Sequence, residues 1–340
     1  MQSPRSLFLL FSATARAVAC GARGLSGLFL GLSLGLAGGP GLAAADPTVE
    51  MVQKISRSAQ ALNFEGTYIH QQNGALYTAR VYHRVNASGE RVTRVQSLDG
   101  PTREVIRSSR EMRAYLPEQR VVRIYKGPAV RPDFPAVFVS NPAWVLDHYH
   151  VEKKPGKRVA DLETDLLVFA PKDQFRWRVH CWVEKRHRLP LKLQVIDLQG
   201  MVLEEYAFSE IRINPSQAPQ VTPSFEGVSD WKQVHAPMSP KEISQSLAAG
   251  GPMIGFRPVA AALISEPALK SLEQHVLSDG LAVVSVFVGP AVDAEYAKPE
   301  VSRRGALSMV VRKKGSQTIT AMGEVPAETV QDLVERFSSQ

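Results

Sequence analysis

The sequence predicts an α+β protein in which a large antiparallel sheet with one solvent-exposed face precedes a smaller α/β unit. The first observation is Phe175–Glu184, where apolar and polar side chains alternate as in a half-buried strand. The second is a series of similar short segments separated by turns between residues 64 and 213. The third is a proline-rich break over residues 214–240. Because 340 residues exceed the usual size of one domain, we expect two.

The first 45 residues have the pattern of a secretory signal peptide. Arginines precede the apolar run Leu25–Ala37, which is too short to cross a bilayer as a single helix, and Ala43–Ala45 supplies small residues for cleavage. We expect cleavage after Ala45 and export of the remainder. An uncleaved N-terminal anchor, or a lipoprotein signal at Cys20, is the alternative.

Removal of this segment changes the charge and the cysteine content. Loss of three arginines lowers the formal charge from +7 to +4, which does not favour nucleic acid as a partner. Only Cys181 then remains, so an internal disulfide cannot form. A core thiol is the main interpretation of Cys181, and an intermolecular disulfide in a homodimer is the other.

The order of elements divides the exported chain into a sheet domain at residues 46–213, a linker at 214–240 and a second domain at 241–340. An amphipathic helix over 46–62 is expected to lie on the first sheet. The apolar segment 126–142 should fold over the open side of that sheet. In the second domain the pattern predicts a helix near 266–277, strands at 281–288, 306–312 and 317–322, and a closing helix at 326–337.

The motifs of common catalytic sites do not occur in the exported part of the chain. Residues 46–340 contain no Gly-x-Ser-x-Gly elbow, no phosphate-binding loop and no His-Glu-x-x-His motif, and the Gly-x-Ser-x-Gly match at Gly31–Gly35 lies in the expected signal peptide. Asp147, His148 and His150 could ligate a metal, since the two histidines would converge from one strand face, but no further ligand pattern completes such a site. We therefore expect neither an enzyme nor a cofactor or metal protein.

The first domain combines many arginines with an apolar sheet face. Eleven arginines between residues 80 and 131 outnumber the acidic residues there. They form either an ordinary solvated outer face or a surface for anionic headgroups, while the apolar face takes acyl chains. The sequence alone leaves both interpretations open.

Several segments resemble a known family. Arg158–Ala160, Ala170–Trp177 (APKDQFRW) and Leu189–Lys192 (LPLK) are similar to the first domain of the MucB/RseB family, and Ser278–Val288 (SDGLAVVSVFV) and Gly323–Pro326 (GEVP) to its second domain. The chain departs from the family pattern at two turns, where Asp161 and His187-Arg188 replace glycine-containing sequences. We expect those turns to avoid the backbone geometry that depends on glycine.

The resemblance implies a LolA/LolB-like half-open barrel joined to a smaller α/β domain, in the periplasm. It implies a negative regulator of the sigma-E (AlgU-type) response, which binds the periplasmic domain of a membrane anti-sigma factor (MucA/RseA-like) and shields it from site-1 proteolysis. A lipid or lipopolysaccharide amphiphile would release it. A periplasmic lipid or lipoprotein carrier without a regulatory partner is the alternative.

Candidate site residues follow from this mechanism. The lipid-side candidates are Phe175, Trp177, Val179, Leu191 and Leu193. The partner-side candidates are Trp231, Phe256, Ser278, Asp279 and Gly280. The segment around Gly280 is alternatively a simple connection in which glycine serves the backbone geometry.

Overall fold

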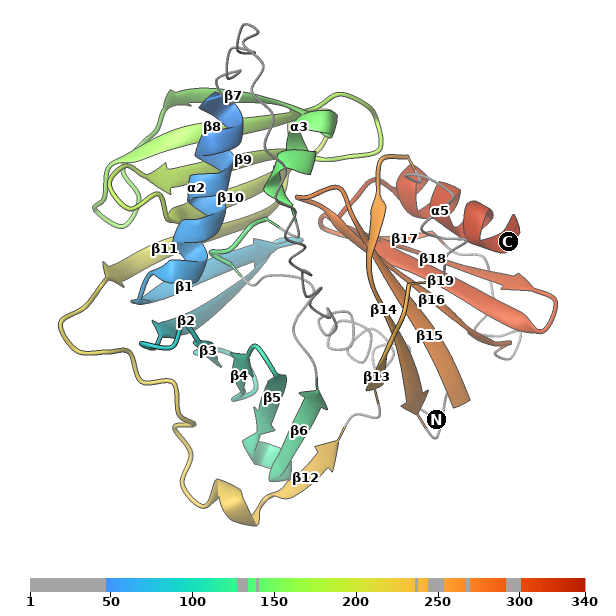
Figure 1. The fold of residues 1–340 in the computed structure, drawn as a ribbon, viewed down its shortest axis with the longest axis horizontal. Helices are drawn as coiled ribbons and strands as arrows, with labels where there is room; N and C mark the ends of the chain where they lie inside the picture. The colour runs from blue at the N-terminus through green and yellow to red at the C-terminus, as the bar shows by residue number, and fades with distance from the viewer. Residues whose placement is uncertain are drawn as a thin grey trace, which may run out of the picture.

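The computed structural model describes residues 47–126, 134–138, 141–235, 238–243, 254–266, 270–291 and 301–339, and shows two sheets (Figure 1). The expected signal peptide lies outside these residues, as do parts of the apolar segment 126–142. Among the described residues, no helix has both the length and the apolar character needed to cross a membrane.

The first sheet is a twelve-stranded, open antiparallel sheet, as the sequence predicts. Its spatial order is β12-β6-β5-β4-β3-β2-β1-β11-β10-β9-β8-β7, and only the β12–β6 pair is parallel. The pairing of β1 with β11 joins its two halves. The strands are β1 (Phe64–Gln72), β2 (Ala75–Val85), β3 (Arg91–Ser97), β4 (Glu104–Ser108), β5 (Glu111–Leu116), β6 (Val121–Lys126), β7 (Tyr149–Pro155), β8 (Thr164–Pro171), β9 (Arg178–Glu184), β10 (Pro190–Ile196), β11 (Val202–Ile213) and β12 (Lys232–His235).

Helix α2 (Pro47–Ala61) covers the concave face of this sheet, as expected (Figure 1). Its apolar stripe enters the core because Val52 and Ile55 pack with strand residues such as Phe169 and Cys181. The described part of the apolar segment also folds inward. Phe134 and Phe138 are both buried against the concave side.

The long strand expected at 175–184 is shorter in the structure. Strand β9 begins at Arg178, and Phe175 and Arg176 lie in the turn that precedes it. Val179, Cys181 and Val183 do point into the core, so the predicted alternation holds from β9 onward. Arg176 does not follow this alternation, because its side chain is completely buried.

The second domain is a seven-stranded antiparallel sheet with one described helix. Its order is β13-β14-β15-β16-β19-β18-β17, and α5 (Ala327–Ser339) packs on one face, where the sequence predicts the closing helix. The strands are β13 (Met238–Lys241), β14 (Arg257–Glu266), β15 (Lys270–Ser278), β16 (Val283–Pro290), β17 (Ser302–Arg304), β18 (Leu307–Lys314) and β19 (Gln317–Gly323).

The helix predicted near 266–277 is wrong, because Glu266 ends β14 and the described residues from Lys270 onward form β15. Val276 packs with the cluster that faces the first sheet, whereas its neighbour Leu277 packs with the cluster beneath α5. A strand buried on both faces loses the alternation of apolar and polar residues that identifies strands.

Most of the predicted linker packs on the outer face of the first sheet. The buried Arg94 donates from Nη1 to the carbonyl of Thr222 at 2.7 Å, and Glu104 accepts from the backbone N–H of Ser224 at 3.0 Å. Trp231 packs with Tyr115 and neighbouring apolar residues, and β12 follows directly. Strand β12 ends at His235 in the first sheet, and β13 begins at Met238 in the second.

The two turns that lack glycine retain left-handed backbone geometry, contrary to expectation. Asp161 has φ 63° and Arg188 also has φ 63°. Arg188 is tied down by its neighbours, since its carbonyl accepts from Ser58 Oγ at 2.7 Å and its guanidinium donates to Asp165 at 3.0 Å. These contacts offset the local strain that a side chain incurs in this region.

Candidate functional site

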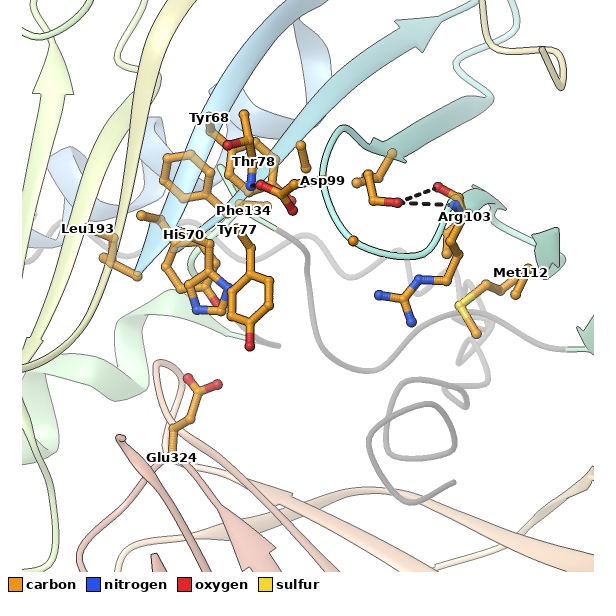
Figure 2. A pocket seen from close by; sticks show the side chains of 18 of the residues that line it. Tyr68, His70, Tyr77, Thr78, Asp99, Arg103, Met112, Phe134, Leu193 and Glu324 are labelled. Carbon is orange, nitrogen blue, oxygen red and sulfur yellow. Dashed lines mark hydrogen bonds between the residues drawn. The ribbon is translucent and has the colours of Figure 1, made fainter. Parts of the chain in front are cut away.

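A cavity of about 760 Å³ lies between the concave face of the first sheet and the second domain (Figure 2). The first domain supplies most of its wall, including Tyr68 and Leu193 from the sheet and Phe134 from the apolar segment that folds over it. The segment Leu281–Val283 and Glu324 close it from the second domain. This volume is in the range of about 300–1,000 Å³ that is typical of ligand cavities in proteins.

One part of the cavity wall is aromatic. The Phe134 ring lies 5.5 Å from the rings of both Tyr68 and Tyr206, and 5.1 Å from Phe208. Helix α2 and the loop carrying Phe134 hold these rings against the sheet. Such a wall offers a ligand a large apolar area.

A polar cluster interrupts the aromatic wall at His70. The His70 ring stacks on Tyr206 with centroids 4.0 Å apart, and its Nε2 lies 2.6 Å from Glu204 Oε1. The Tyr206 hydroxyl donates to the same carboxylate at 2.8 Å. Because Glu204 is buried, its contacts with His70 and Tyr206 hold these two side chains in place as a polar patch of the cavity wall.

The β3–β4 loop contributes charged groups to the wall. Asp99 accepts a hydrogen bond from the Thr78 backbone N–H at 2.5 Å. Arg103 follows in the same loop and also lines the cavity (Figure 2). The cavity is therefore mainly apolar, with charged groups on its β3–β4 side.

Three of the five lipid-side candidates line this cavity: Trp177, Val179 and Leu193. Leu191 is buried in the core and does not line it. Phe175 lies in the turn before β9, where its carbonyl accepts from Thr329 Oγ1 of α5 at 2.7 Å. The indole Nε1 of Trp177 donates to the carbonyl of Ala306 at 2.9 Å, so this cavity residue also contacts the second domain.

Next to the cavity, a buried ion pair joins the domains. Arg176 Nε donates to Asp279 Oδ2 at 2.7 Å, and both side chains are completely buried. Arg176 also donates to Asp173 at 2.5 Å and to the carbonyl of Ile254 at 2.7 Å. The Tyr149 hydroxyl donates to Asp279 at 3.1 Å. We call Tyr149, Arg176 and Asp279 the junction cluster.

The partner-side candidates have structural contacts of their own. Phe256 is buried beneath Arg176, whose guanidinium carbon lies 4.8 Å from the centre of its ring. The Ser278 hydroxyl donates to the carbonyl of Ala282 at 2.9 Å. Gly280 has a positive φ of +103°, and it packs against Val145 of the first domain. Trp231 lies apart from these residues on the outer face of the first sheet. The structure therefore brings Phe256, Ser278, Asp279 and Gly280 to the domain junction.

Burial changes the acid–base properties of several groups. Desolvation raises the pKa of the Cys181 thiol to about 12. Desolvation and the nearby Asp279 charge raise the pKa of Tyr149, while desolvation and Arg176 lower the pKa of His148. The part of the chain that the structure describes contains no group of three or more His, Cys, Asp or Glu side chains placed to bind a metal.

Sequence reasoning missed Arg176 and the His70 cluster. Arg176 occupies a polar position of the predicted strand, where a solvated arginine is the usual outcome, and its partner Asp279 is 103 residues away. His70 and Glu204 come from β1 and β11 and meet only because these strands pair. Only knowledge of the strand order could have brought them together.

The fold and cavity define a class of protein: a two-domain protein with an open antiparallel sheet and a ligand-sized cavity closed by its second domain. Family models identify it further. The MucB/RseB N-terminal domain model matches residues 47–226 and the MucB/RseB C-terminal domain model matches residues 243–338. The chain belongs to the MucB/RseB family.

Curated relatives cover most of the chain. The Sigma factor AlgU regulatory protein MucB of Pseudomonas aeruginosa is 24% identical over 86% of this chain and 90% of its own. The Sigma-E factor regulatory protein RseB of Salmonella typhimurium is 21% identical over 86% of this chain and 91% of its own. The family's named members are thus sigma factor regulatory proteins.

Solved structures share the fold. The complex of Pseudomonas aeruginosa MucA and MucB aligns with a TM-score of 0.63 and 20% identity, covering 85% of this chain and 97% of that one. A crystal structure of MucB aligns with a TM-score of 0.59 and 22% identity, covering 87% and 98%. At these sequence identities, the structural similarity establishes the fold.

Proposed function

We propose that this protein is a periplasmic negative regulator of a sigma-E (AlgU-type) factor and not an enzyme. It binds the periplasmic part of a MucA/RseA-type anti-sigma factor and protects that segment from site-1 proteolysis. A lipid or lipopolysaccharide amphiphile that enters the cavity weakens this complex. The family membership and the named relatives support the regulatory role.

The shared cavity wall is the observation that carries the mechanism. Leu281–Val283 and Glu324 of the second domain face Tyr68, Trp177 and Leu193 of the first across one space. An occupant of that space contacts both domains, so its affinity depends on how they are arranged. A ligand shifts such an equilibrium only by its differential affinity for the two arrangements.

The candidate residues take separate roles in this proposal. Trp177, Val179 and Leu193 contact the amphiphile. Ser278, Asp279 and Gly280, together with Phe256, act on partner binding by holding the second domain in place, because they lie at the junction. Trp231 fixes the segment before β12 on the first sheet and so sets where the chain crosses to the second domain.

The test is calorimetry of the purified protein with the periplasmic segment of the anti-sigma factor, in the presence and absence of a lipopolysaccharide fragment. We expect micromolar or tighter binding that the fragment weakens, and slower cleavage of the segment by the site-1 protease when the protein is present. A segment of the same composition in scrambled order is the control. Retained amphiphile binding without any segment binding would favour the lipid carrier instead.

A further inference from the structure

Exposed aliphatic side chains gather at one end of the first sheet. Of the ten large hydrophobic side chains that are exposed in the described residues, five belong to this end, which we call the apolar rim: Leu76 (64%), Leu98 (43%), Leu198 (61%), Met201 (65%) and Val202 (47%). Single exposed apolar residues are ordinary, whereas a group of them indicates an interaction site.

Strand register places the rim residues together. Gln72 at the end of β1 pairs with Ala75 of β2 and with Glu204 of β11, so the β1–β2 turn lies beside the β10–β11 turn. Leu98 follows β3, and its backbone N–H donates to the carbonyl of Thr78 at 2.9 Å. Three neighbouring chain turns therefore present the rim at one edge of the molecule.

The β10–β11 turn is held in a defined conformation by its own hydrogen bonds. Asp197 accepts from the backbone N–H groups of Gln199 at 3.0 Å and Met201 at 2.8 Å. These bonds fix the backbone while Leu198 and Met201 remain more than half exposed. An ordered turn with outward aliphatic side chains is suited to insertion into an apolar medium.

Cationic groups of the second domain border the rim. Arg303 and Arg304 are exposed on β17, and Arg304 Nη2 donates to the Tyr77 hydroxyl at 3.3 Å beside Leu76. Gly305 follows, packed so closely that an added Cβ would meet Gln72 and the carbonyl of Leu203. Aliphatic side chains flanked by arginines match the interface of an anionic membrane, with apolar groups below its headgroups and cations among them.

The rim is continuous with the cavity. Tyr77 and Thr78 line the cavity next to Leu76, and the loop that begins with Leu98 lines it through Asp99–Arg103 (Figure 2). A membrane in contact with the rim therefore lies beside this part of the cavity wall. The charged side of the cavity is then nearest to the headgroups.

We propose that the apolar rim docks this protein on the surface of a bilayer that contains anionic phospholipid. Leu198 and Met201 enter the interface, and Arg303 and Arg304 contact lipid phosphates. This goes beyond the proposed function, because docking on a bilayer requires neither the anti-sigma factor nor an occupied cavity.

The test is co-sedimentation of the purified protein with vesicles of phosphatidylcholine, with and without phosphatidylglycerol. The Leu198→Ser/Met201→Ser variant should bind the anionic vesicles at least about tenfold more weakly, because the two aliphatic side chains that would enter the bilayer interface are lost. Val234→Ser/Leu263→Ser is the matched control, since both residues are exposed but lie outside the rim. Arg303→Gln/Arg304→Gln should reduce the preference for anionic vesicles.

Binding of the anti-sigma segment should be unchanged in the rim variant, which separates this proposal from the proposed function. The unfolding midpoint of each variant shows whether it is folded. Absence of vesicle binding by the unaltered protein, or equal loss in the control, overturns the proposal. So does a dimer in sedimentation equilibrium that the rim substitutions dissociate, because the rim would then bind a second copy of the chain.

Discussion

Arg176 and Asp279 form a completely buried ion pair, 2.7 Å between Nε and Oδ2, across the junction of the two domains. Asp279 Oδ1 also accepts from the backbone N–H groups of Leu281 at 2.9 Å and Ala282 at 2.7 Å. Those two residues line the cavity. A single carboxylate thus connects an arginine of the first domain to the cavity wall of the second.

Asp279→Ala is expected to destabilise the protein strongly. The Arg176 charge would lose its fully buried partner, and breaking such a pair typically costs about 3–5 kcal/mol. Chemical denaturation followed by tryptophan fluorescence measures the loss. Arg212→Ala, which removes an exposed partner of Glu65, should change stability little. Comparable effects of the two variants would show that the junction pair is energetically unimportant.

Gly255→Ala tests the packing of the same junction. Gly255 has φ +85°, and an added Cβ would overlap the Arg176 guanidinium and the His148 ring. Gly315 also has positive φ, at +57°, but its surroundings are open, so Gly315→Ala measures the backbone strain alone. We expect a clearly larger drop in the unfolding midpoint for Gly255→Ala. Equal drops would mean that the side chains at the junction accommodate the added methyl group with no loss of stability.

His83 should make stability depend on pH. Desolvation, reinforced by Arg91, lowers the pKa of this buried ring from 6.5 to about 4. The unfolded chain binds a proton near pH 6.5 and the folded chain only near pH 4. The unfolding free energy therefore falls as pH drops through that window, by up to about 3 kcal/mol.

His83→Gln removes this titration. Urea denaturation measured between pH 7 and pH 4 should show that the unfolding free energy falls less steeply with decreasing pH for the variant than for the unaltered protein. The difference between the two curves isolates His83, because the pKa values of His148, His180 and His275 are also lowered by burial and contribute to both. Parallel curves of unfolding free energy against pH would contradict the lowered pKa of His83.

Cys181 should be unreactive in the folded protein. It is buried, and with a pKa of about 12 only about one molecule in ten thousand carries the thiolate at pH 8. Iodoacetamide labelling, read by mass spectrometry of the peptide that contains Cys181, should require denaturant. Labelling at similar rates in the native and denatured protein would reopen the intermolecular disulfide as an interpretation of this residue.

Trp177→Phe should separate ligand binding from its effect on the partner. Phenylalanine keeps an aromatic cavity wall but cannot donate to the Ala306 carbonyl of the second domain. We expect amphiphile affinity within a few-fold of the unaltered protein and a smaller effect of the amphiphile on anti-sigma binding, both by calorimetry. If the amphiphile weakens anti-sigma binding as much in the variant as in the unaltered protein, the Trp177–Ala306 hydrogen bond does not contribute to the coupling between the two sites.

Sequence reasoning succeeded where one physical pattern dominates. The amphipathic helices α2 and α5 each bury a single face, so their periodicity is visible, and the turn residues between the strands of β1–β6 identify that meander. It failed at β15, where burial on both faces conceals the strand. It also did not reveal how the linker packs, because a proline-rich pattern does not show that Arg94 and Glu104 will bind the segment to a sheet.

The candidate site was predicted in part for the same reason. Trp177, Val179 and Leu193 could be found because the cavity wall is the apolar face of predicted strands. The junction cluster could not, because it depends on how the second domain packs against the first. That packing is determined by long-range contacts such as those of Met112 and Tyr125 with the second sheet, which no local pattern encodes.

The most direct test of the coupling between cavity and partner is its reciprocity. Calorimetry would measure the affinity for the anti-sigma segment with and without saturating lipopolysaccharide fragment, and the affinity for the fragment with and without saturating segment. Linkage requires both affinities to weaken by the same factor, and we expect that factor to be at least about fivefold. Unchanged affinity for the segment when the cavity is saturated would contradict the account.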